Sequence, residues 1–147
     1  MSRKLGIALA VLTALIVTVA SALAANAHFI GTPKLTVSGN SITVSASIAG
    51  LGNAAGADFS LTGSVDVFSR CYNRGGNKPQ ADNKQETVAV NQSATFPVRN
   101  GRTDPSFTIA PLSTLTCPGN QVVVIESISW NLTLSGEGVS YNFVGSQ

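Results

Sequence analysis

The 147-residue chain has few charged side chains (11%), many apolar ones (44%) and a formal net charge of +2. Arg3 and Lys4 account for all of that excess, so the charge of the remaining chain is balanced. A nucleic-acid-binding protein needs a strongly basic face, because it gains affinity by releasing counterions from phosphates. The balance therefore argues against a nucleic-acid partner. The length is enough for one domain with a real core.

The first 27 residues have the layout of a signal peptide. Arg3 and Lys4 precede a weakly polar to apolar run from Leu5 to Ala20, and small residues lead to an Ala-x-Ala triplet that ends at Ala27. Signal peptidase accepts only small side chains before the cut. We predict cleavage after residue 27 and a secreted, extracellular product with no membrane contact after leader removal. An uncleaved membrane anchor is the alternative, because the stretch from Leu5 to Ala25 is just long enough to span a bilayer.

Residues 28–147 are expected to form a single all-β domain. Apolar and polar residues alternate repeatedly with a period of two, which marks strands with one buried face. In chain order, the expected strands lie within 35–37, 42–48, 58–71, 94–98, 107–109, 121–134 and 139–143. Turns are expected at 39–40 and 136–138, and a flexible loop at 50–56. Short strands separated by Gly, Asn and Pro predict an immunoglobulin-like antiparallel β-sandwich, with a closed barrel as the alternative.

The longest apolar strand changes register in its middle. Val123 and Ile125 have one parity, whereas the apolar residues from Ile128 onward have the other. The two registers meet at Glu126-Ser127, where we predict a β-bulge that turns both apolar sets to one face. The alternative is an inward-pointing Glu126, which is costly unless the carboxylate is paired.

The chain has two cysteines, Cys71 and Cys117. In an exported protein, two cysteines most simply form one disulfide. Closing a loop of this size stabilises the fold by about 4 kcal/mol in the chain-entropy model. Metal binding by the pair is disfavoured, because no further soft ligands lie nearby in the sequence. The enclosed segment is the least regular part of the pattern.

A polar stretch follows the first cysteine. It is rich in glycine and amides, it is cationic, and Tyr72 is its aromatic residue. A loop of this composition could hold a sugar or an acidic polymer by hydrogen bonds and stacking. The candidate ligand-binding residues are Tyr72, Asn73, Arg74, Lys78 and Lys84. The alternative is a solvated connection whose Asn and Gly residues only supply turns.

The same stretch carries a motif. It reads Cys-x-Asn-x-Gly-Gly-x-x-Pro-x-Ala-x-Asn-Lys from Cys71 to Lys84, and Leu115-Thr116-Cys117-Pro118 follows as a second element. Together with the His-Phe pair at His28, these elements resemble a family of small secreted bacterial proteins of uncharacterised function. The resemblance covers most of the chain after the leader. It implies export, a β-rich fold and pairing of the two cysteines, and it implies no activity.

The side-chain inventory predicts that the protein is not an enzyme. Ser-His-Asp and Cys-His arrangements need an internal imidazole, and the single histidine is His28. The same count argues against zinc sites built from several histidines. Asp58 and Asp66 share a strand face, and two carboxylates are what glycosidases use, but we expect that face to be turned to solvent.

His28 is the one candidate metal ligand. If cleavage follows Ala27, the α-amine and imidazole of His28 can chelate copper together. Secreted copper oxygenases that attack polysaccharides begin with such a histidine, but they add a second one, which this chain lacks. A carboxylate such as Asp58 or Asp104 would have to substitute. No other cofactor is expected.

The leading hypothesis is a secreted non-catalytic binding or structural module. Its partner is a cell-surface ligand, a glycan or further copies of itself. One alternative is a copper-binding protein that uses His28. Another is a carrier of a small apolar ligand in the cleft of the sandwich, by analogy of fold with secreted antibiotic-carrying apoproteins.

Overall fold

The computed structural model describes residues 26–75 and 79–147, and every regular element in that part of the chain is a β-strand. In chain order the strands are β1 (His28–Phe29), β2 (Lys34–Ser38), β3 (Ser41–Ser45), β4 (Ile48–Ala49), β5 (Gly56–Asn73), β6 (Pro79–Pro97), β7 (Ser106–Ile109), β8 (Gln121–Gly136) and β9 (Val139–Ser146). None of the described residues belongs to a helix that could cross a membrane.

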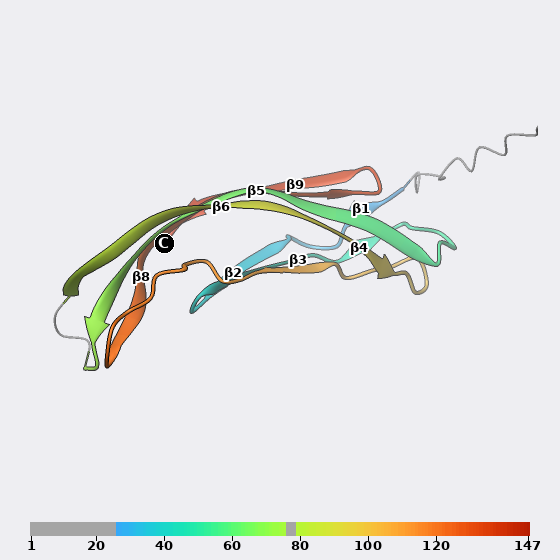
Figure 1. Ribbon diagram of the computed structural model, residues 1–147. Coiled ribbons are helices and arrows are strands. Elements are labelled where there is room, and N and C mark those ends of the chain that lie inside the picture. The colour runs from blue at the N-terminus through green and yellow to red at the C-terminus, as the bar shows by residue number, and fades with distance from the viewer. Residues whose placement is uncertain (1–25, 76–78) are drawn as a thin grey trace, which may run out of the picture.

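The strands form two packed layers (Figure 1). One layer is a four-stranded antiparallel sheet in the order β6-β5-β8-β9. The other contains the three-stranded sheet β2-β3-β7 and the short pair β1-β4. The predicted all-β sandwich is therefore confirmed, and so is its disulfide between Cys71 and Cys117. The immunoglobulin-like type stays a prediction, and residues 1–25 of the predicted signal peptide lie outside the described residues.

The core lies between the layers and follows the predicted alternation. Ile42 and Val44 of β3 are fully buried, as are Leu61 and Val65 of β5. Gly63 interrupts the β5 row, and it has a φ of 133°. A Cβ atom there would lie 2.1 Å from the Asn131 carbonyl oxygen, so only glycine lets β8 approach this closely. Aromatic edges close the sides of the core, at Phe96–Phe107 and Phe29–Tyr141.

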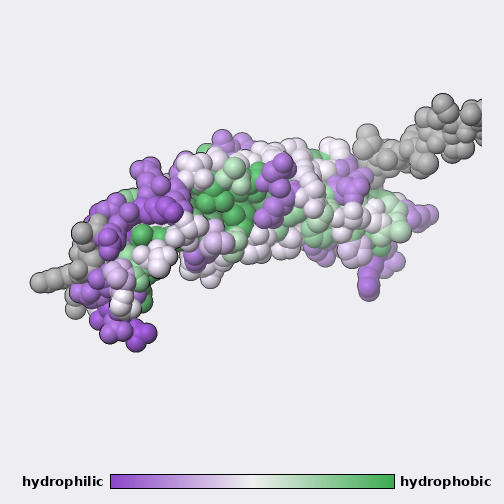
Figure 2. Space-filling model, viewed as in Figure 1, coloured by the Kyte–Doolittle hydropathy of each residue, from purple (hydrophilic) through white to green (hydrophobic). Residues whose placement is uncertain are grey.

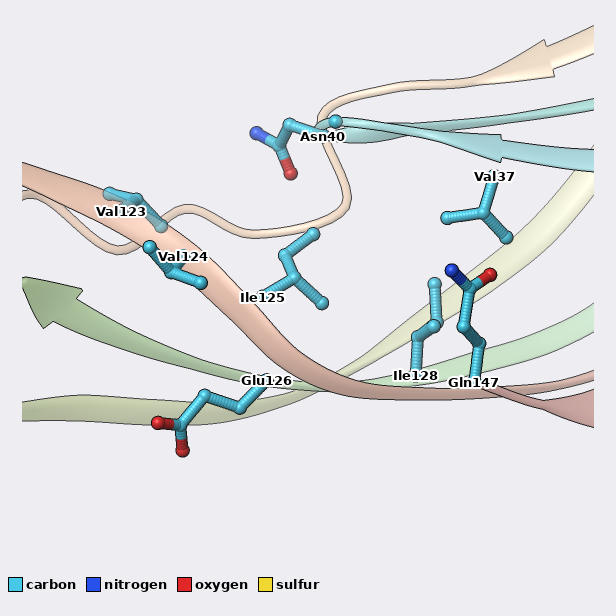
Figure 3. A pocket seen from close by; sticks show the side chains of 9 residues that line it. Val37, Asn40, Val123, Val124, Ile125, Glu126, Ile128 and Gln147 are labelled. Atoms are coloured by element: carbon cyan, nitrogen blue, oxygen red, sulfur yellow. The ribbon is translucent and has the colours of Figure 1, made fainter. Parts of the chain in front are cut away.

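The predicted β-bulge is present. Phe68 pairs with Ser127 and Ser69 pairs with Ile125, which leaves Glu126 as the extra residue of β8. Ile125 and Ile128 therefore point to the same side of β8, and Glu126 points to the other (Figure 3). The alternative of an inward Glu126 is wrong. Both expected turns are also confirmed, with two-residue connections at 39–40 and 137–138.

The structure corrects the expected strand lengths. We predicted short strands and an irregular segment between the cysteines, whereas β5, β6 and β8 have 18, 19 and 16 residues. Strand β6 occupies much of that segment, so Lys84 lies on a strand and not in a loop. The reason is that β6 is an edge strand. It is held by backbone pairing with β5 along its length, and this pairing does not need an alternating apolar pattern.

The three long strands continue past the second layer and curve downward at the left of Figure 1. We call this part the distal arm, and the rest of the molecule the body. The arm consists of residues 69–73 of β5, 79–85 of β6 and 121–127 of β8, together with the connection 110–120. In Figure 2, hydrophilic surface covers the upper side of the arm, and apolar surface lies beneath it and between the two layers of the body.

Candidate functional site

A polar network ties the connection 110–120 to the sheet. Glu86 on β6 accepts hydrogen bonds from the Ser113 hydroxyl at 3.0 Å and from the Thr114 amide at 2.9 Å. The buried Ser69 hydroxyl of β5 lies 2.6 Å from the Ser113 hydroxyl. The Thr114 hydroxyl also donates to Glu86, and these bonds, led by that one, lower the pKa of the carboxyl from 4.5 to about 2. The underside of the arm is thus held by hydrogen bonds in place of a hydrophobic layer.

Two further contacts fix this connection. The Asn40 side chain, in the β2–β3 turn, accepts hydrogen bonds from the amides of Leu112 and Ser113 at 3.0 and 2.7 Å. The Cys71–Cys117 disulfide joins the connection to the end of β5. The arm is therefore fastened to the body at one end and closed by a covalent bond near its tip.

Of the five candidate ligand-binding residues, two are engaged within the arm. Tyr72 donates its phenol hydrogen to Glu126, the residue in the bulge, and this bond raises the pKa of the phenol. Glu126 also lies 3.6 Å from the Arg70 guanidinium. Lys84 lies 3.0 Å from Glu86 and donates to the Thr114 hydroxyl. These side chains bind one another, so stacking of a sugar on Tyr72 loses support.

Two other candidates, Asn73 and Arg74, lie together at the end of the arm. They line an open groove with a volume of about 620 Å³. We call it the tip groove, and its lining residues are Asn73, Arg74, Pro118, Gly119, Asn120 and Gln121. The fifth candidate, Lys78, lies outside the described residues.

Sequence reasoning missed Asn120 and Gln121, which form the other wall of the tip groove. In the sequence, Gln121 marks only the start of an apolar strand. Its Oε1 atom is buried and has no hydrogen-bond partner, which is unusual for a buried amide oxygen. The signal that would have found this wall is the disulfide, because a bond from Cys71 to Cys117 places residues 73–74 beside residues 118–121.

A second groove is apolar and lies where the arm meets the body. It has a volume of about 580 Å³, and we call it the edge groove. Val37 of β2 faces Ile128 and Gln147 across it, and Ile125 points into it (Figure 3). Its lining residues are Val37, Gly39, Asn40, Val123, Val124, Ile125, Glu126, Ile128 and Gln147.

The candidate metal ligand His28 is exposed at the start of β1, where it pairs with Ala49. Its Nδ1 atom lies 2.8 Å from the Asn26 carbonyl oxygen. Of the two carboxylates considered as further ligands, Asp104 accepts a hydrogen bond from Ser47 and Asp58 accepts one from Thr95. The described residues contain no group of three His, Cys, Asp or Glu side chains arranged to hold a metal ion.

The chain matches no protein-family model and no curated protein. The candidate site therefore stands on its own geometry. That geometry offers amides and a guanidinium in the tip groove, an apolar surface in the edge groove, and a disulfide of the kind that forms in an oxidising compartment.

Proposed function

We propose that this protein is a secreted, non-catalytic binding module whose distal arm carries the binding surface, and that the tip groove holds a polyhydroxylated or acidic glycan. The observation that carries the proposal is the groove itself. Its lining combines Arg74 with three amide residues, Asn73, Asn120 and Gln121. Side-chain amides both donate and accept hydrogen bonds, which suits sugar hydroxyls, and a guanidinium binds carboxylates or sulfates in a fork.

Export would give such a module access to cell-surface glycans. We propose that the chain belongs with the small secreted bacterial proteins that it resembles. The Cys71–Cys117 disulfide is consistent with this assignment.

The test is binding of the protein to an acidic polysaccharide, with alginate as the probe and a neutral glucan beside it. We expect Arg74→Ala and Asn120→Ala each to weaken binding to alginate at least about tenfold, since a charge-assisted hydrogen bond contributes roughly 1.5–3 kcal/mol. Arg99→Ala is the matched control, because Arg99 is an exposed arginine outside the tip groove. Equal binding by Arg74→Ala and wild type would overturn the proposal.

A carrier function remains the second candidate, favoured by the edge groove. Val37, Ile125 and Ile128 give this groove an apolar lining of a size that suits a small ligand. The site differs from the predicted one, since the space between the layers is filled by buried side chains. Native mass spectrometry of the secreted protein tests it. A carrier should show a bound small molecule that is lost under denaturing conditions, and a bare mass would exclude this candidate.

A further inference from the structure

Part of β8 is an unpaired sheet edge. Strand β5 pairs with one side of β8 from Gln121 onward, whereas β9 pairs with the other side only from Ser129. Ile128 and Gln147 exchange the last two backbone hydrogen bonds on that side. Among the described residues, no strand continues along β8 beyond this point. We call residues 121–127 of β8 the open edge. Its outward N–H and C=O groups form a template on which another strand can add.

The open edge is apolar on both faces of the sheet. Val122, Val123 and Val124 are 42%, 38% and 38% exposed, and they are consecutive. Val123 pairs with the inward-facing Cys71 and shares its face, while Val122 and Val124 lie on the outer face opposite Tyr72 and Arg70. An added strand would therefore cover apolar side chains above and below the sheet, with the edge groove on the lower side.

The edge strands β6 and β2 carry features that hinder strand addition. The edge strand β6 carries the charged residues Asp82, Lys84 and Glu86, and β2 begins with Lys34 after a proline. The open edge has no lysine, arginine or proline. Its single charge is Glu126, which is turned to Tyr72 and Arg70 on the outer face. The bulge at Glu126 disturbs the edge at the end nearest β9, so the stretch suited to pairing is 121–125.

We propose that residues 121–125 of β8 pair antiparallel with the same residues of a second copy, about a two-fold axis at Val123. The proposal rests on the proposed function only because both assign the binding surface to the distal arm. Each copy offers the same edge, so antiparallel pairing about a two-fold axis is self-complementary and closed. The partner strand would lie beside β8, in line with β9 and beyond the point where the pairing with β9 stops. The two four-stranded sheets would then join into one continuous sheet.

The charges of the segment favour a second copy as the occupant. In this register Val122 lies opposite the partner's Val124, and no charged residue lies opposite another within the paired stretch. The two Glu126 carboxylates lie about six residues apart along the strands, or roughly 20 Å, which is well beyond the screening length in physiological salt. The pairing is short, so we expect a dimer that dissociates on dilution.

The experiment is sedimentation velocity on the secreted protein over a range of concentrations. We expect wild type to shift from monomer to dimer as concentration rises. Val123→Lys should raise the dimer dissociation constant at least about tenfold, because two lysines would then meet at the axis. Val123→Glu should do the same. An equimolar mixture of the two variants should restore dimerisation, because the lysine of one copy would then lie opposite the glutamate of the other. This result is expected only if residue 123 lies on the two-fold axis, where it faces residue 123 of the second copy.

Val144→Lys is the matched control. Val144 is 71% exposed on β9, an edge strand outside the proposed pairing, so its replacement should leave the dissociation constant unchanged. A wild type that is monomeric throughout, or a mixture that fails to dimerise, would overturn the proposal. If the variants do not fold, hydrogen exchange on wild type decides, because dimerisation must slow exchange at 121–125 as concentration rises and unchanged exchange refutes it.

The same samples separate this inference from the proposed function. A monomeric wild type that binds alginate through Arg74 would refute the pairing and leave the glycan proposal intact. A wild type that dimerises but does not bind alginate would support the pairing and refute the glycan proposal.

Discussion

The body and the distal arm share the three long strands β5, β6 and β8, but they are stabilised in different ways. In the body, alternate residues of β5 are apolar and buried against the second layer, as at Leu61 and Val65. In the arm, the same alternation reaches Ser69 and Cys71, which are equally buried but face the connection 110–120. A hydroxyl pair and a disulfide there replace hydrophobic packing. The comparison shows that one strand can leave its hydrophobic layer when specific bonds cover its inner face.

The largest expected effect is removal of the disulfide. A Cys71→Ala, Cys117→Ala double variant should lose about 4 kcal/mol of unfolding free energy, because the bond closes a loop with a sequence separation of 46. Urea unfolding measures the loss. Hydrogen exchange should show that amides of 121–127 lose protection before those near Leu132, which is fully buried in the body. Uniform loss over both regions would show that arm and body open as one unit.

The next effect comes from one substitution made in both regions. Val65→Ala should cost about 2.5 kcal/mol, because Val65 is fully buried in the body and its truncation leaves a cavity. Val123→Ala in the arm should cost less than about 1 kcal/mol, since Val123 already contacts solvent. Urea unfolding of the two variants beside wild type gives the difference. Similar costs at the two sites would contradict the distinction between a packed body and an uncovered arm.

A smaller effect depends on pH. The pKa of Glu86 is lowered to about 2 in the fold from 4.5, so the fold is stabilised by the ionised form. That contribution is complete above about pH 4.5 and is lost as the pH falls toward 2. Glu86→Gln should therefore melt at a lower temperature than wild type at neutral pH, and the gap should close in acid. Thermal melts across this range measure it, and a gap independent of pH would show that the charge of Glu86 has no part in holding the arm.

The smallest effect is local to the outer face of the arm. Glu126→Ala should bring the pKa of Tyr72 back down toward the ordinary value, because the carboxylate that accepts the phenol hydrogen is removed. Ultraviolet titration in a Tyr141→Phe background isolates the Tyr72 signal. The melting temperature should change little, since the contact is exposed. An unchanged Tyr72 titration would show that the contact does not persist in solution.

Much of the body could be predicted because its alternating apolar and polar residues indicate strands with one buried face and nothing else. Strict alternation from Ile42 to Ile48 and from Phe59 to Val67 places those residues in the core. The bulge at Glu126 follows from counting, since a single extra residue restores the parity of the apolar positions on either side. The turns followed from glycine and asparagine at positions between two alternating runs.

The arm could not be predicted in the same way. Most of β6 before Val88 is polar, so neither periodicity nor composition distinguishes this edge strand from a solvated loop. Its structure depends on pairing with β5, which is not visible in the local sequence. The tip groove also required a contact between distant residues, and only the disulfide hinted at it. The candidates Tyr72 and Lys84 were chosen by residue type, and their engagement with Glu126 and Glu86 could be seen only in three dimensions.

The continuity of β5 and β8 from arm to body also determines how the molecule carries load. If a ligand held at the tip groove is pulled along the arm, the force runs parallel to the strands that enter the core. Because residues of both β5 and β8 line the groove, the two strands share this force, and the hydrogen bonds between them are not opened one after another from an end. The Cys71–Cys117 bond lies beside the point where such a force would enter the sheet. A tether built in this way should resist mechanical extension better than its equilibrium stability suggests.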